Sequence, residues 1–222
     1  EKSIVTISQN GYIKRLKDDS YKKQSRGGKG VTGQTLKEED IVDTVRICNT
    51  HDTAVFFTSR GRVYKMKVWD IPESSRTAKG MSLANFLNIT QGEKVEAFLS
   101  LSSEQMADKN SFIMLGTRKG IVKKTPLEEF ANIRSAGITA INLTDGDSLV
   151  WAKVSSGRDT VLIATSQGLA IRFDETQVRA MGRAAGGVMG VKFAKKDDYL
   201  IGMDVVEKSK DTNYTVMTAT EL

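Results

Sequence analysis

The sequence has very few of the side chains on which metal centres and nucleophilic catalysis depend. Its 222 residues include one cysteine, Cys48, and one histidine, His51. No intrachain disulfide can form, and neither a metal-ligand spacing nor a nucleophile–base set is present. Cys48 is expected to pack as a small apolar residue, and His51 to lie in a solvated turn. We therefore predict a non-catalytic chain with no metal site and no cofactor of its own.

Acidic residues are the remaining candidates for chemistry. Carboxylate pairs occur at Glu38-Glu39, Glu128-Glu129 and Asp197-Asp198. Such pairs can carry out general acid–base catalysis. These pairs recur where turns are expected, however, which favours solvated loop charges over an active site.

Long apolar runs are also missing. No stretch approaches the ~18 apolar residues of a membrane-spanning helix, and no signal-peptide pattern opens the sequence. Hydrophobic residues make up 39% of the chain, which is enough for the core of one domain. We expect a cytoplasmic protein without a membrane partner, and we expect this domain to be monomeric.

What the sequence does contain is a four-fold repeat. In each copy a short apolar run, a Ser or Thr, two polar residues and a glycine precede a strand-like stretch with a basic fourth residue. The turn glycines are Gly11, Gly61, Gly120 and Gly168, which lie 50, 59 and 48 residues apart. A period of this size indicates one supersecondary unit repeated, with each unit burying its apolar face against the next.

A second marker recurs about fifteen residues after each turn glycine. It is an arginine followed by small residues, a glycine and an apolar strand, at Arg26–Val31, Arg76–Met81, Arg134–Ile138 and Arg183–Val188. An acidic turn and another apolar run follow, which gives about four short strands per unit. Four-stranded units at a period of about 40 to 50 residues are typical of radially arranged blades. We therefore predict an all-β, propeller-like fold.

The repeats also predict blade boundaries within a single domain. The blades are expected at residues 1–51, 52–110, 111–158 and 159–211, with the start of a fifth at 212–222. Only brief helical stretches are expected, at residues 103–108 and 127–132. If neighbouring blades share strands, the apolar run at residues 214–217 should complete the fourth blade, because a bare sheet edge promotes aggregation.

The net charge of +6 is unevenly distributed. Residues 1–30 contain eight Lys or Arg against three acidic residues, and residues 109–158 contain eight against four. The second residue after each turn glycine is apolar and should pack inward. The fourth shares its face and should carry a charge outward on an apolar stem. These fourth residues are Arg15, Lys65, Lys124 and Arg172.

A curved basic track of this kind suits bent duplex DNA that is contacted through its phosphates. No aromatic ladder accompanies the basic residues, which argues against a single-strand binding platform. We therefore predict a DNA-binding rim. Its predicted members are Lys14, Arg15, Lys22, Lys23, Lys65, Lys67, Arg76, Lys79, Lys123, Lys124, Arg134, Arg172 and Arg183.

One glycine-rich segment of the first repeat is more specific. It consists of Gln24, Ser25, Arg26, Gly27, Gly28, Lys29 and Gly30. Its glycines let backbone N–H groups approach a phosphate, to which Arg26 and Lys29 add a planar fork and a point charge. The spacing and the missing terminal Lys-Ser/Thr distinguish it from a Walker A loop.

This segment closely resembles the GyrA box, Gln-Arg-Arg-Gly-Gly-Lys-Gly, which marks the first blade of the C-terminal domain of the DNA gyrase A subunit. Six of the seven positions match. Ser25 is the departure, and it replaces a phosphate-binding cation by a small donor. The repeats around Arg134 and Arg183 are similar to later blades of the same family, so the resemblance covers essentially the whole chain.

The resemblance implies a β-pinwheel, a six-bladed relative of the propeller in which neighbouring blades share strands. It also implies that the domain binds and wraps duplex DNA around its basic rim. In gyrase, a bacterial cytoplasmic A2B2 assembly of A and B subunits on the chromosome, wrapping presents a nearby DNA segment for strand passage. ATP-driven turnover then introduces negative supercoils. The cleaving tyrosine, ATP and magnesium would belong to other domains.

Two alternatives remain open at this point. The C-terminal domain of the topoisomerase IV A-type subunit has similar blades but typically lacks an intact box. A propeller that serves as a protein-interaction scaffold belongs to another functional class. Such a scaffold would have no salt-sensitive affinity for DNA.

Overall fold

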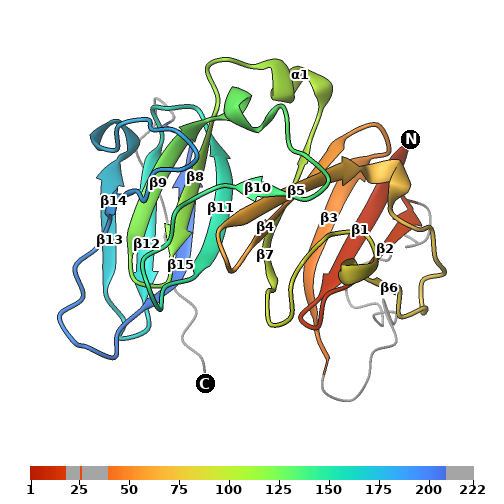
Figure 1. Ribbon diagram of the computed structural model, residues 1–222, viewed down its shortest axis with the longest axis horizontal. Helices are drawn as coiled ribbons and strands as arrows, with labels where there is room; N and C mark the ends of the chain where they lie inside the picture. The colour runs from red at the N-terminus through yellow and green to blue at the C-terminus, as the bar shows by residue number, and fades with distance from the viewer. Residues whose placement is uncertain (19–25, 27–39, 209–222) are drawn as a thin grey trace.

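The four repeats form four antiparallel β-sheets that follow one another across the molecule (Figure 1). The computed structural model describes residues 1–18, 26 and 40–208. Sheets dominate every repeat, and the helical segments are short. The predicted all-β, propeller-like fold is confirmed.

Each repeat contributes three long strands to its own sheet. The first repeat provides β1 (Lys2–Ser8), β2 (Tyr12–Lys17) and β3 (Val42–Asn49). The second provides β4 (Thr53–Thr58), β5 (Arg62–Lys67) and β7 (Val95–Leu101). The third provides β8 (Phe112–Thr117), β9 (Ile121–Pro126) and β11 (Leu149–Ser155), and the fourth provides β12 (Thr160–Thr165), β13 (Ala170–Asp174) and β15 (Leu200–Val206). In every repeat the first strand pairs with the other two.

A short strand from the following repeat completes each of the first three sheets. β6 (Met81–Ser82) pairs with β2, β10 (Ile138–Thr139) with β5, and β14 (Val188–Met189) with β9. Within the described residues the fourth sheet has three strands, in the order β13-β12-β15. The sharing of strands between blades, which the resemblance implied, is confirmed.

The exchanged strand is the one that follows the second sequence marker. Each begins directly after a left-handed glycine, Gly80, Gly137 or Gly187, with φ between +73° and +87°. A Cβ atom at Gly137 would lie 2.5 Å from Cε1 of Tyr64, so only glycine lets the strand approach the preceding blade this closely. The expectation for residues 214–217, which open a repeat, falls outside the described residues.

The hydrophobic core lies between neighbouring blades. Side chains alternate along β4, so Phe56 and Phe57 point into different clusters. Phe56 packs in one cluster with Val5 of the first blade, and Phe57 in another with Leu115 of the third. A third cluster lies between the third and fourth blades. Because the central strands are covered on both faces, their sequences are continuous apolar runs.

A carboxylate fixes each hairpin turn, and it is buried in three of the four repeats. Asp198 accepts hydrogen bonds from the Ser166 hydroxyl and from the N–H groups of Gln167 and Tyr199. Burial alone would raise its pKa, but these hydrogen bonds outweigh burial and lower it. Asp198 is 6% exposed, so the expectation of a solvated Asp197-Asp198 pair is wrong for this residue. The acids in the equivalent place of the other repeats are Asp40, Glu93 and Asp147.

The helical segments are brief. α1 (Ser103–Ala107) and the 3-10 helix η4 (Leu127–Phe130) occupy the two stretches in which helical character was expected. The other 3-10 helices within the described residues are η2 (Val68–Asp70), η3 (Leu83–Asn85) and η5 (Glu175–Gln177). In the described part of the chain no helix is long and apolar enough to cross a membrane.

The cysteine and the histidine lie where they were expected. Cys48 is a free, buried thiol on β3, and burial raises its pKa. His51 is exposed in the turn between β3 and β4, with its ring edge-on to Trp69. No group of three or more metal-ligating side chains occurs within the described residues.

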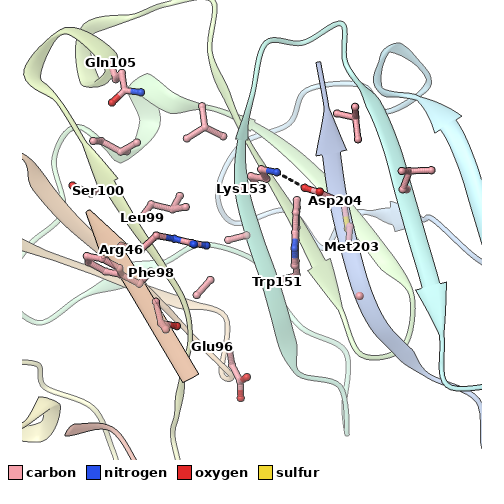
Figure 2. Close-up of a pocket in the computed structure, with 18 of the residues that line it drawn as sticks. Arg46, Glu96, Phe98, Leu99, Ser100, Gln105, Trp151, Lys153, Met203 and Asp204 are labelled. Atoms are coloured by element: carbon pink, nitrogen blue, oxygen red, sulfur yellow. Dashed lines mark hydrogen bonds and ion pairs between the residues drawn. The ribbon is translucent and has the colours of Figure 1, made fainter. Parts of the chain in front are cut away.

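The last strands of the repeats meet where the blades converge. β3 contacts β7, β7 contacts β11, and β11 contacts β15. A cavity between them is lined by apolar side chains and by charges of both signs, including Arg46 and Glu96 (Figure 2). Lys153 of β11 forms an ion pair with Asp204 of β15. None of the described residues predicted for the rim lines this cavity.

Candidate nucleic-acid interface

Four basic side chains from three repeats line a groove at the outer edge of the second and third blades. They are Arg62 and Lys65 of β5, Arg134 and Arg183. This rim groove has a volume of about 820 Å³, and its other lining residues are Asn132, Ile133, Gly137, Ile138, Thr139 and Ala184. No lining residue, all of which fall in the described range 40–208, carries a carboxylate. The groove is therefore attractive to an anion.

Backbone carbonyls hold two of these side chains without neutralising them. Nη2 of Arg62 donates to the carbonyl oxygens of Ala136 at 2.6 Å and Gly137 at 3.3 Å. Nζ of Lys65 donates to the carbonyl oxygen of Ala131 at 2.5 Å. A guanidinium has five N–H donors and an ammonium three, so donors remain for phosphate oxygens.

The two other cations of the groove differ in their surroundings. Arg134 is exposed. Arg183 is 34% exposed, and its Nε lies 3.8 Å from a carboxylate oxygen of Glu129. Nη1 of Arg183 donates to the carbonyl oxygen of Thr139 at 3.3 Å. The ion pair is loose, so Arg183 keeps most of its attraction for an approaching anion.

The basic loop of the second repeat, residues 76–80, lies on the preceding blade. Arg76 and Lys79 are half-buried there. Nζ of Lys79 lies 3.6 Å from the centroid of the Tyr12 ring, a cation–π contact that orients the side chain. Lys67, at the end of β5, is also half-buried.

Three lysines predicted for the rim are buried. Lys14 and Lys123 are 0% exposed and Lys124 is 6% exposed. Nζ of Lys124, for example, donates to the backbone carbonyl of Glu175 at 3.1 Å. The prediction that these lysines face solvent is wrong, because segments of the following repeat pack over them.

The fourth residue after the turn glycine is not equivalent in the four repeats. The Arg15 side chain is 13% exposed and lies 3.4 Å from a carboxylate oxygen of Glu73. The following repeat forms isolated bridges with Arg15 and with Lys124, which covers both. Arg172 is exposed on β13, to which no described strand of a following repeat is paired. The expected row of four outward cations is therefore wrong.

The box of the first repeat is described at one residue. Arg26 is exposed in a turn. The other predicted residues of this region lie outside the described residues, namely Lys22, Lys23, Gln24, Ser25, Gly27, Gly28, Lys29 and Gly30. Their part in DNA binding stays a prediction.

Arg62 is a groove residue that the sequence analysis missed. It directly follows the turn glycine of the second repeat, where the other repeats have Tyr12, Ile121 and Leu169. The repeat pattern therefore gave no reason to expect a charge there. The signal that could have found Arg62 was this exception: a cation at a position that is otherwise apolar or aromatic.

Blades that exchange short strands and present basic loops at their outer edge define a propeller-type repeat domain. A family model described as "DNA gyrase C-terminal domain, beta-propeller" matches residues 2–49, 52–102, 111–156 and 159–207. The chain belongs to this family. The resemblance seen in the sequence is confirmed.

The relatives with similar sequences are A subunits of DNA gyrase. The chain is 44% identical over 190 residues to the DNA gyrase A subunit of Clostridium acetobutylicum, a match that covers 86% of the chain and 22% of that protein. It is 43% identical over 221 residues to that of Mycolicibacterium smegmatis, a match that covers 99% of the chain and 26% of that protein. The chain thus spans about a quarter of the length of these relatives and corresponds to their C-terminal, non-catalytic part.

Solved structures with the same fold carry both topoisomerase names. A C-terminal domain of DNA topoisomerase IV matches with a TM-score of 0.74 and 28% identity, covering 94% of this chain and 62% of that one. A DNA gyrase A C-terminal domain matches with a TM-score of 0.73 and 24% identity, covering 92% and 65%.

Proposed function

We propose that the chain binds duplex DNA without sequence preference and bends it around its outer edge. The observation that carries this proposal is the rim groove, in which four cations converge and no lining residue is acidic. Phosphate neutralisation by such cations releases condensed counterions whatever the base sequence. Guanidinium groups held by backbone carbonyls can donate paired hydrogen bonds to phosphate oxygens. Such contacts do not involve the base edges and carry no sequence preference.

Bending follows from the distribution of the basic loops. The loops at residues 76–80, 134–137 and 183–187 come from successive repeats, and each lies against the preceding blade through an exchanged strand. A duplex that contacts all three must follow the curvature of the blades. Bending 20 to 30 base pairs by 40 to 90° costs on the order of 1 to 6 kcal/mol, which several charge-assisted phosphate contacts can offset.

In the whole protein, wrapping by this domain would present a nearby DNA segment for strand passage and so support negative supercoiling. The partners would be duplex DNA and the other parts of an A2B2 gyrase assembly, which are the remainder of the A chain and the B subunits, in the bacterial cytoplasm on the chromosome. ATP and magnesium would be used by other domains, and this domain would need no cofactor. The gyrase relatives support this assignment.

A role in topoisomerase IV is the second candidate, because a solved domain of that enzyme matches with a TM-score of 0.74. The two candidates differ in the activity of the assembled enzyme. A gyrase subunit would support the introduction of negative supercoils into relaxed DNA. A topoisomerase IV subunit would support relaxation without it.

The DNA proposal is tested by binding to two unrelated duplexes across a salt series, with bending followed by energy transfer between labelled duplex ends. We expect equal affinity for both duplexes, a steep loss with salt, and increased energy transfer on binding. Arg134→Ala with Arg183→Ala should lower the salt slope by about two and weaken binding ~10-fold or more. Lys109→Ala with Arg158→Ala removes the same charge from exposed positions outside the groove and serves as control.

A DNA affinity that does not change with salt concentration would contradict the proposal, as would a difference in affinity above tenfold between the two duplexes. The lack of a salt-sensitive affinity for DNA would favour a protein-interaction propeller. Equal weakening by the groove pair and the control pair would show that net charge, and not the groove, governs binding.

A further inference from the structure

Lys14 caps the basic loop of the following repeat. Its side chain is completely buried. Nζ donates to the carbonyl oxygens of Ser75 at 3.3 Å, Arg76 at 2.5 Å and Ala78 at 2.8 Å. All three carbonyls belong to the second repeat's basic loop or the residue before it. One ammonium that joins three carbonyls fixes the path of that backbone.

Lys123 stands at the same place in the third repeat, three residues after the turn glycine. Its side chain is also completely buried. Nζ donates to the carbonyl oxygen of Arg183, and to that of Ala140 at 2.7 Å. The backbone of Arg183 is thus anchored, and its side chain lines the rim groove. The lysine therefore holds the backbone of a residue whose guanidinium faces the proposed DNA path.

The loop of the third repeat is held from the second by different side chains. Tyr64 takes the place of the lysine, and its ring lies directly beneath Gly137. Arg62 donates to the carbonyl oxygens of Ala136 and Gly137. Each described basic loop of the second, third and fourth repeats is thus anchored by the blade before it.

We propose that Lys14 and Lys123 are positioning residues for DNA: each holds the basic loop of the following repeat so that its arginine is presented at the outer edge. Neither lysine contacts DNA itself, because neither reaches the surface. This inference rests on the proposed DNA binding. The surface arginines would contact DNA, and the buried amines would hold the backbone that carries them.

The electrostatics agree with an anchoring role. Burial lowers the pKa of Lys14, and Arg76 lowers it further. Burial also lowers the pKa of Lys123 to about 8, with Glu129 raising it and Arg183 lowering it. Methionine at either position would leave the anchored carbonyls without their donor, which is unfavourable, but it would also remove the free-energy cost of burying an ammonium. Removal of the amine should therefore free the loop without unfolding the blade.

Lys123→Met tests the proposal, because it keeps the stem and removes the donor. We expect an unchanged or raised thermal midpoint, faster amide hydrogen exchange in residues 182–187, and duplex bending reduced to less than half. Lys109→Met makes the same change at an exposed position and should alter none of these. The double variant Lys123→Met with Arg183→Ala should bend DNA no less than Arg183→Ala alone, since the lysine acts through the arginine.

The outcomes separate the two proposals. If the parent chain does not bend DNA, the proposed function fails, while loop exchange in Lys123→Met still reports whether the anchor exists. If the parent bends DNA and Lys123→Met bends it equally with unchanged exchange, the positioning role is wrong. Additive losses in the double variant would also overturn it. If Lys123→Met does not fold, Lys14→Met with Arg76→Ala provides the same cycle in the second loop.

Discussion

The second repeat carries out with different side chains what the first and third repeats do with lysine. Where they have Lys14 and Lys123, it has Tyr64, helped by Arg62. Its turn is fixed by Glu93 instead of an aspartate. The exchanged strand and its glycine are nevertheless in the same place. The comparison teaches that this fold preserves the path of the backbone and lets the anchoring chemistry vary.

The glutamate of the second repeat also fixes its turn, but it accepts hydrogen bonds from other donors than the aspartates do. Thr58 donates its hydroxyl to Glu93 at 2.5 Å, and Thr90 donates both its N–H and its hydroxyl. Burial alone would raise the pKa of Glu93, but these bonds outweigh it and lower the pKa. This carboxylate therefore stabilises the turn at neutral pH, and its contribution is lost as the pH falls through the lowered pKa.

The largest effect is expected where the second blade's tyrosine meets the exchanged loop. Gly137→Ala adds a Cβ 2.5 Å from the Tyr64 ring at a φ of +73°, so strain and steric overlap combine. We expect a loss of about 2 to 4 kcal/mol in the free energy of unfolding, measured by urea denaturation. Gly11→Ala has a similar φ of +77° and no atom within 4 Å, and it should cost only about 1 kcal/mol. Equal losses would show that backbone strain alone matters.

A pH titration separates the lysine anchors from the tyrosine anchor. The pKa of Lys123 is about 8 in the folded chain against a usual value of 10.5. Between these values the unfolded chain binds more protons, so the contribution of Lys123 to stability rises with pH. We expect the parent to gain up to about 3 kcal/mol relative to Lys123→Met between pH 8 and 10.5. A parent and variant with parallel pH profiles would contradict the lowered pKa.

The smallest effect tests how much the tyrosine anchor depends on its hydroxyl. The Tyr64 hydroxyl donates to the carbonyl oxygen of Asn88 at 2.8 Å and accepts from Nε of Arg62 at 3.2 Å. Tyr64→Phe should lower the free energy of unfolding by about 1 kcal/mol, because the ring contact with Gly137 remains. A loss above about 3 kcal/mol would mean that the hydroxyl, and not the ring, is the anchor.

The sequence predicted the fold because its signals are local. A turn glycine, a second glycine after small residues and apolar runs between them specify strands within one repeat, and their period specifies the array. Strand sharing was implied by the family resemblance, but the identity of the exchanged segment was not evident. The exchanged segment is only two residues long. In β10, for example, its pairing depends on the close approach of Gly137 to Tyr64 of the preceding repeat.

The candidate site was less predictable, because exposure is decided by distant residues. Lys14 is covered by carbonyls 61 to 64 positions further along the chain. Strand alternation alone placed Lys124 outward, yet the following repeat forms a bridge with it. Arg134 and Arg183 were found because they belong to the recurring loop marker, whereas Arg62 breaks the repeat pattern and was not.

Strand exchange determines where this chain can be divided. A cut at residue 110, between the second and third repeats, separates β5 from β10 and Tyr64 from Gly137. The smallest piece with a complete sheet is therefore a repeat plus about thirty residues of the next. The sequence repeat does not coincide with the complete sheet, because each sheet takes its last strand from the following repeat. Deleting one repeat would therefore damage two blades. Each blade is expected to lend stability to the one before it, and neighbouring blades should unfold together.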